Sequence, residues 1–515
     1  MRAGIEPLVA HRARLDRVRP DLDLRSLAIA AGLGLFAILV LRTAWVCDDA
    51  YITLRTVDNF VHGYGLRWNV DERVQSYTHP LWLLLLSGPY ALTHEAFFTT
   101  VAISVALAVG AVYLFVTRIA ASLEGILIGL ATFVFSKAFV EFSTSGLENP
   151  LTTFLLAVFF VVYWRGGPRR EQMLWIVVGL LMVNRLDTGV LVLPIVIGDA
   201  WAKPWRTTIA SAAIGLLPFA AWEVFSVVYY GFPVPNTAYA KLQTGVLAPA
   251  LIGQGLLYLV DSIAQDPVTL LVAATALVTA VRVDRARSWP IAAGVVLYLA
   301  FVVRAGGDFM SGRFLVAPLF CAVAALGRVR WPSASSAAAW SIASIALIGL
   351  AATTHPPMTS GAETFADGPK FGVSGVADER SFDYPNAGLL RWTRERPLPV
   401  GEWVAYGHAL RGQSRVVVRA NIGLFGYYAG PTLHVIDAYG LADPLIARLP
   451  ALQPWRIGHF ERGVPDGYER SIETGTNRIT DPQVAALYEQ LKTITQGRLW
   501  TRARWRAIGR LNLGW

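Results

Sequence analysis

Long apolar runs separated by short polar breaks occupy the first two-thirds of the chain. The first run extends from about Ser26 to Val46 and has the roughly 20 residues that a membrane-spanning helix needs. Further runs lie near 80–93, 97–117, 122–140, 149–164, 172–201, 207–229, 246–262, 267–282, 288–304, 312–327 and 336–353. Several are short, and 172–201 has charges in its middle, so the pattern predicts roughly 11–13 transmembrane helices.

Six arginines precede the first apolar run and indicate its orientation. They are Arg2, Arg12, Arg14, Arg17, Arg19 and Arg25. No small-residue cleavage pattern follows the run, so we expect a retained helix and not a signal peptide. Because cationic flanks stay in the cytoplasm, the segment 47–79 is predicted to be the first extracytosolic loop.

The pattern changes after about Thr354, where no further spanning run occurs. Short β-like stretches follow at Trp403–Tyr406, Arg415–Val418 and Leu433–Ile436, and a helix-like stretch lies near Gln483–Thr493. Residues 498–515 alternate Arg with apolar residues, which is typical of a helix on a membrane surface. The predicted fold is an α-helical polytopic membrane domain at 1–353 and an extracytosolic α/β domain at 354–515.

Composition supports the membrane class and excludes other classes. The chain is 54% hydrophobic and 16% charged, whereas soluble domains are about 25% charged. Its formal net charge of +9 lies largely beside apolar segments, which favours anionic lipid headgroups as partners over nucleic acid. Two cysteines, Cys47 and Cys321, cannot form a disulfide framework or a zinc site, and we interpret both as packing residues.

Adjacent carboxylates open the first outer loop, at Asp48 and Asp49. Carboxylates at the end of a spanning helix are costly unless they are paired or functional. Either could act as the general base that takes a proton from an attacking hydroxyl. The pair could also hold a divalent cation, or it could simply cap a helix that starts near Ala50.

The rest of this loop is amphipathic and aromatic. Residues Thr56 to Asn69 have helical spacing, which predicts a helix lying flat on the bilayer, and Tyr77-Thr78-His79-Pro80 opens the next apolar run. With the Asp pair, these features resemble the GT-C class of glycosyltransferases, which use polyprenyl-phosphate sugars.

Later motifs make the resemblance more specific. They are Ser143–Glu148, Asn184–Asp187, Tyr229–Lys241, Gly306–Arg313, Val376–Arg380 and Ile436–Pro444. In this order the set resembles the terminal arabinofuranosyltransferases of the mycobacterial cell wall. The tail is shorter than in that family, and Asp187 stands where we expect Glu.

The resemblance implies a donor of the decaprenyl-phosphate-arabinofuranose type. Its sugar would pass to the end of cell-wall arabinan, in arabinogalactan or lipoarabinomannan, on the outer face of the cytoplasmic membrane. The implied product is β-linked from a β-phosphate, so net retention follows, by a carboxylate nucleophile or by front-face attack. No cofactor is implied with certainty; a divalent cation at Asp48 and Asp49 is possible.

The site prediction assigns each charged residue a role. Asp48 and Asp49 are the catalytic candidates. The candidates for binding the donor phosphate are Arg55, Arg185, Lys241 and Arg313, and further site candidates are His79, Glu148, Asp187, Asn236 and Asp308.

Structural roles compete with these assignments. Arg185 and Asp187 could form an ion pair between helices, and Lys241 and Arg313 could sit at headgroup level. Asp308 could cap a helix and Glu148 could begin one. A transporter of lipid-linked sugars, or a GT-C enzyme for another sugar, is the alternative function; related halves, common in transporters, are not visible.

The Arg-rich start and the outer Asp loop predict opposite locations for the two ends of the chain. Cysteines introduced at residues 5 and 380 should therefore react with a membrane-impermeant reagent from opposite sides of the membrane. Labelling of both from the same side would contradict this topology.

Overall fold

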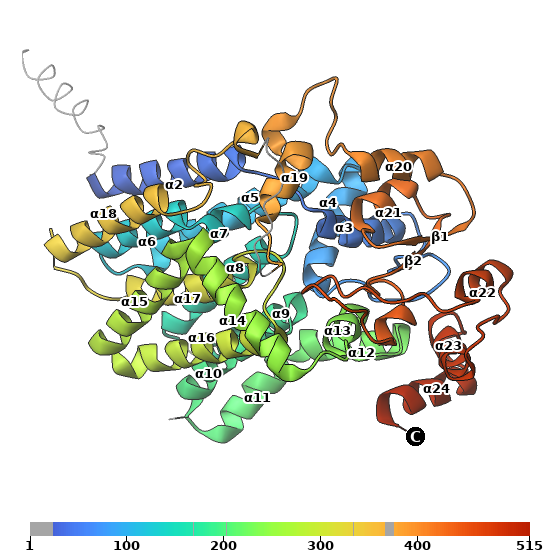
Figure 1. The fold of residues 1–515 in the computed structure, drawn as a ribbon. Helices are drawn as coiled ribbons and strands as arrows, with labels where there is room; N and C mark the ends of the chain where they lie inside the picture. The colour runs from blue at the N-terminus through green and yellow to red at the C-terminus, as the bar shows by residue number, and fades with distance from the viewer. Residues whose placement is uncertain (1–23, 168, 202, 333, 366–374, 515) are drawn as a thin grey trace, which may run out of the picture.

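The computed structural model describes residues 24–167, 169–201, 203–332, 334–365 and 375–514. Helices dominate this part of the chain, and Figure 1 shows the apolar helices gathered at one end and the tail elements at the other. The main apolar helices are α2 (Leu24–Arg42), α4 (Pro80–Thr93), α5 (Phe97–Leu114), α6 (Leu123–Phe135), α8 (Asn149–Trp164), α9 (Arg170–Asn184), α10 (Thr188–Ala200), α11 (Trp205–Gly215), α12 (Leu217–Tyr229), α14 (Ala248–Gln265), α15 (Pro267–Val283), α16 (Arg285–Ala305), α17 (Val316–Gly327) and α18 (Ser336–Ala351).

Only some of the described helices are long and apolar enough to cross a membrane. Phe97–Ile119 and Arg285–Ala305 each meet both conditions as single helices. Two bent pairs pass together: α11 with α12, bent by 49°, and α14 with α15, bent by 103°. Seven shorter apolar helices accompany them. The chain is thus a helix-rich membrane protein, and the count of 11–13 spans stays a prediction.

One predicted apolar run is two helices. Within 172–201, α9 ends at Asn184 and α10 begins at Thr188. Arg185 has extended backbone geometry at the break. The charges in the middle of this run therefore mark a turn.

The helix of the first outer loop differs from the prediction in position and in surroundings. Helix α3 spans Asp48–Val61, so it starts before Ala50 and ends well before Asn69. Nine of its 14 residues are buried, and it packs against α4 and α21 (Gly423–Ala429). The solvated face expected of this helix is not observed, because the tail covers it. That the helix lies flat on the bilayer stays a prediction.

The tail contains a small parallel sheet. Strands β1 (Val416–Arg419) and β2 (His434–Asp437) pair in register, with Val416 opposite His434. Both match predicted strands. The third prediction, Trp403–Tyr406, is wrong: these residues lie in helix α20 (Glu402–Leu410), which packs on α21 and thereby buries Val404.

The last helices fasten the tail to the membrane domain. Helix α23 (Pro482–Thr495) confirms the prediction near Gln483–Thr493, and α24 (Arg502–Leu513) follows it. The buried guanidinium of Arg504 donates to the carbonyls of Val228 and Tyr229, at the end of α12, at 2.8 and 3.0 Å. The amphipathic segment is therefore helical and docked on protein; whether it also touches lipid stays a prediction.

The structure also improves the labelling test. Arg380 is 1% exposed, so a cysteine there would react slowly on either side. Thr476 is exposed and is the better position for the tail label.

Candidate active site

Asp48 binds the tail. Its carboxylate accepts hydrogen bonds from the backbone amides of Gly423 and Leu424, at 3.2 and 2.7 Å, across 375 sequence positions or more. These residues begin α21, so Asp48 caps that helix, while α3 itself has no side-chain cap. A Cβ at Gly423 would lie 1.9 Å from the backbone oxygen of Asp48, so only glycine permits this approach.

Asp49, the next residue, lines a small cavity and has no hydrogen-bond or ion-pair partner among the described residues. The cavity measures about 20 Å³, room for roughly one water. Six segments form its wall: α3, the end of α13 (Asn236–Leu242), the loop after α16, the residues after β1, the residues after β2, and the loop at Gly458. We call this cavity the Asp49 pocket.

Lys241 supplies the cation of the Asp49 pocket. It lies in the last turn of α13 and is half-buried. No carboxylate within the described ranges forms an ion pair with it. The pocket thus brings together a carboxylate and an ammonium group that are unpaired among the described residues, and both are site candidates from the sequence.

An aromatic cluster, which the sequence did not predict, closes one side of the pocket. The ring of His459 contacts those of Phe309 and Tyr439, with centroids 4.4 and 5.1 Å apart. Burial, and next the charge of Arg456, lowers the pKa of His459 to about 4. His459 is therefore neutral at physiological pH and acts as a ring and a hydrogen-bonding group.

Two acidic residues of α19 (Glu379–Ala387) adjoin the pocket and were not assigned as site residues. Burial, and next the charge of Asp49, raises the pKa of Glu379 to about 8. Burial and the charge of Glu379 raise the pKa of Asp383 well above its usual value. The motif Val376–Arg380 was the feature of the sequence that could have indicated Glu379. Its spacing does not show that this segment lies beside Asp49.

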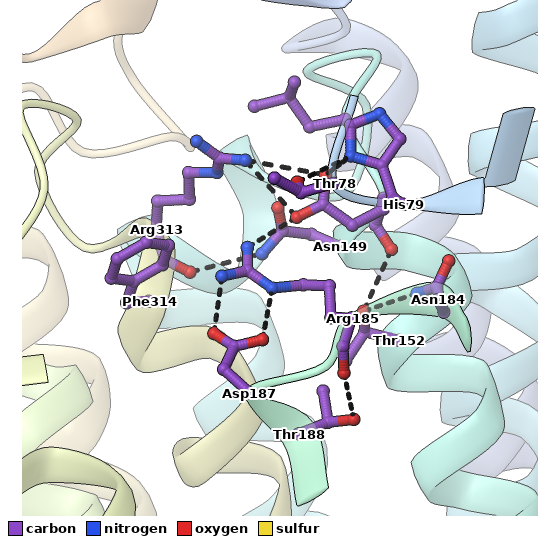
Figure 2. A network of polar contacts seen from close by, with 12 residues as sticks. Thr78, His79, Asn149, Thr152, Asn184, Arg185, Asp187, Thr188, Arg313 and Phe314 are labelled. Carbon is purple, nitrogen blue, oxygen red and sulfur yellow. Dashed lines mark hydrogen bonds and ion pairs between the residues drawn. The ribbon is translucent and has the colours of Figure 1, made fainter. Parts of the chain in front are cut away.

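A second cluster centres on Glu148, at the start of α8. This carboxylate has no exposed surface and is 2.6 Å from the guanidinium of Arg185, 3.3 Å from that of Arg313 and 3.0 Å from Nδ1 of His79. Figure 2 shows Arg313, Arg185 and His79 converging from separate segments of the chain. The sequence named all four residues but did not predict that they meet.

Both arginines of the cluster have further carboxylate partners. Arg185 forms two bonds to Asp187, at 2.9 and 2.6 Å, and Arg313 lies 3.4 Å from Asp308. The contacts of Arg185 and Asp187 therefore match the alternative interpretation, in which the two residues form a structural ion pair. Asp308 precedes no helix directly; instead it accepts from the amide of Phe309 at 2.9 Å.

His79 links the two clusters. Its Nε2 lies 2.8 Å from the hydroxyl of Thr53, and its other ring nitrogen faces Glu148. Thr53 is one helical turn from Asp49 on α3, so the two lie on the same side of that helix. The Glu148 cluster thus holds the helix that carries Asp49.

Two site candidates lie elsewhere. Arg55 is buried beneath the tail, where it stacks on Trp68 at 4.0 Å and donates to the carbonyl of Leu433 at 2.9 Å. Asn236 donates to the carbonyls of Gly440 and Asp443, at 2.8 and 3.0 Å. Neither lines the Asp49 pocket, and both join outer loops to the tail.

The residues around the Asp49 pocket provide few ligands for a metal ion. Among the described residues, no three His, Cys, Asp or Glu side chains lie close enough to hold an ion. Both oxygens of Asp48 already accept amide hydrogens. The divalent cation therefore stays a prediction.

Comparison with known proteins supports the predicted class, since the chain is similar over most of its length to glycosyltransferases. One relative is the terminal β-(1→2)-arabinofuranosyltransferase of Mycobacterium tuberculosis, 28% identical over 87% of this chain and 85% of its own length. The enzyme of the same name from Corynebacterium glutamicum is 27% identical over 81% of this chain and 72% of its own. The resemblance inferred from the ordered motifs is thereby confirmed. No family model and no solved structure matches the chain.

The burial of Asp48 predicts a pH-dependent stability. Burial raises the pKa of Asp48 to about 7, whereas an unfolded Asp titrates near pH 3.9. The folded chain then keeps a proton that the unfolded chain loses, so this contribution is complete below about pH 4 and is lost as pH rises to about 7.

We expect the melting temperature of the detergent-purified protein to fall between pH 5 and 7. Asp48→Asn should remove about 1–3 kcal/mol of that dependence. The measurement is thermal unfolding at each pH. An identical pH dependence in wild type and variant would contradict the assignment.

Proposed function

We propose that this chain is a membrane glycosyltransferase that transfers arabinofuranose from a polyprenyl-phosphate donor to the end of an arabinan chain. The observation that carries the proposal is the meeting of Asp49 and Lys241, unpaired, in one pocket of a chain similar to two terminal β-(1→2)-arabinofuranosyltransferases. That similarity favours transfer over transport, because both relatives are named as transferases. Decaprenyl phosphate is the donor lipid that the family resemblance suggests.

Asp49 is the group that acts on the reacting atoms. A new glycosidic bond forms between the acceptor oxygen and the anomeric carbon, and the acceptor hydroxyl loses its proton. Asp49 can take this proton as general base, or attack the anomeric carbon first. Asp48 cannot easily substitute for it, because its oxygens are held by two amides.

Lys241 is placed to receive the other product. The bond between sugar and phosphate breaks with its electron pair on the phosphate oxygen, and a cation at that position stabilises the developing charge. Arg185 and Arg313 are engaged by Glu148, Asp187 and Asp308. They hold the site in shape, so Lys241 is the cation available for phosphate among the described residues that line the pocket.

A donor needs more room than the Asp49 pocket offers. Its volume of about 20 Å³ is far below the roughly 300–1,000 Å³ of ligand sites. Substrate entry therefore requires the segments around it to separate. The loops at Phe309 and His459 contribute rings to its wall, and their displacement would open the pocket.

The proposal includes location and domain organisation. The membrane domain comprises 1–353 and the tail 354–515. The tail and the 47–79 loop face the extracytosolic side of the cytoplasmic membrane, where lipid-linked donor and wall polymer would meet. Support comes from the N-terminal arginines and from the contact of α3 with α21.

Asp49→Asn tests the catalytic role. The substitution keeps size and removes charge, so we expect kcat for transfer to a synthetic arabinofuranosyl acceptor to fall roughly 100-fold or more. Acceptor and donor KM should change little, since the lost interaction acts on the transition state. Glu395→Gln, at an exposed tail carboxylate outside the pocket, is the control. Near-normal turnover by Asp49→Asn would refute the role.

Lys241→Ala tests phosphate recognition. Because Lys241 forms no ion pair with a described carboxylate, its removal should leave the melting temperature nearly unchanged while donor KM rises about tenfold, which corresponds to about 1.4 kcal/mol. Lys241→Arg should restore much of the affinity. A variant with unchanged donor KM and kcat would place Lys241 at the headgroups instead.

A further inference from the structure

A second cleft lies in the tail, away from the Asp49 pocket. Its volume is about 370 Å³, within the usual range for ligand sites. Its polar lining consists of Asp71, Ser414, Arg415, Thr432, His434 and Glu473. We call it the tail cleft.

The tail cleft and the Asp49 pocket occupy opposite ends of the same two strands. Arg415 precedes β1 and His434 begins β2, and both line the cleft. Residues 420–422 and Tyr439, which follow the two strands, line the pocket. Because a strand rises about 3.3 Å per residue, the two sites are roughly 15 Å apart.

Part of the cleft is rigidly built. Nδ1 of His434 lies 3.0 Å from Asp71. Beside them, the side chain of Asn69 donates to the carbonyl of Val435 and accepts from its amide, both at 3.1 Å. This pairing fixes the outer loop along the free edge of β2, so Asp71 is held over the cleft.

Other polar groups of the cleft have no partner. Within the described part of the chain, the side chains of Ser414, Arg415 and Glu473 form no hydrogen bond or ion pair. They offer both donors and acceptors to a ligand. The carboxylate of Asp71 faces His434 and that of Glu473 opposes the charge of Arg415, so the cleft has no excess of cations for a phosphate. Hydroxyl groups, which donate and accept, fit this lining.

We propose that the tail cleft binds the acceptor polysaccharide several sugar units from the end that reacts at Asp49. The inference rests on the proposed function. Its ligand is a neutral polyhydroxylated chain, recognised through hydroxyl hydrogen bonds. The lipid donor is excluded, because it would need unopposed cations and an apolar surface.

The test compares acceptors of two lengths. The double variant Arg415→Ala with Glu473→Ala removes two exposed side chains that have no partner in the described part of the protein. The matched control is Glu469→Ala with Arg470→Ala, which removes the same charges from exposed positions outside the cleft. Acceptors are an arabinofuranosyl disaccharide and a linear oligosaccharide that spans more than roughly 15 Å.

We expect the cleft variant to raise KM about tenfold for the long acceptor only, with donor KM, kcat and disaccharide KM unchanged. The control should behave as wild type. Equal KM for the long acceptor in both variants, or equal losses with long and short acceptors, would overturn the proposal.

Binding of the long oligosaccharide to the purified full chain without donor separates the two claims. If wild type transfers to no arabinofuranosyl acceptor, yet binds the oligosaccharide and the cleft variant does not, the proposed function fails and the cleft stands. If wild type and cleft variant bind it equally, the cleft proposal fails whatever the activity.

Discussion

A buried carboxylate, Glu148, is the constraint on which the arrangement of the site depends. Removed from water, its charge must be neutralised by protein, and three cationic or protonatable side chains from distant segments approach it to do so. Arg185 comes from the break between α9 and α10, Arg313 from the turn before α17, and His79 from the start of α4. Removing any of the three would leave the buried charge of Glu148 less well neutralised, so the cluster fixes four segments together. Through His79 and Thr53 it also fixes α3.

The opposite side of α3 is fixed by the tail. Asp48 provides the hydrogen-bond acceptors that the first amides of α21 lack, and Gly423 allows the two helix starts to touch. The two adjacent carboxylates therefore have different roles: Asp48 joins the tail to the membrane domain, and Asp49 faces the cavity. The tail therefore forms part of the wall of the Asp49 pocket, because the segments after both strands line it.

Hydropathy was sufficient for the apolar helices, the position of the tail and two of its strands, because these depend on local patterns. Prediction from hydropathy failed where tertiary packing determines the secondary structure or the buried face of a segment. Trp403–Tyr406 is apolar enough for a strand but packs as a helix on α21, and the buried face of α3 depends on a tail more than 300 residues away. Asp49 and Lys241 were identifiable from residue type and position. Glu379 and His459 were not, because only folding brings the tail to the first outer loop.

The small volume of the Asp49 pocket bears on a reaction that such an enzyme must avoid. Water is a competing nucleophile for an activated sugar, and at a membrane surface it vastly outnumbers sugar hydroxyls. A cavity with space for about one molecule of solvent, walled by the rings of Phe309, Tyr439 and His459, admits little of it. If the wall opens to admit the donor and closes again over the acceptor, hydrolysis is suppressed by exclusion. The preference for transfer to the polymer over transfer to water would then come from the same packing that leaves the resting pocket too small for the donor.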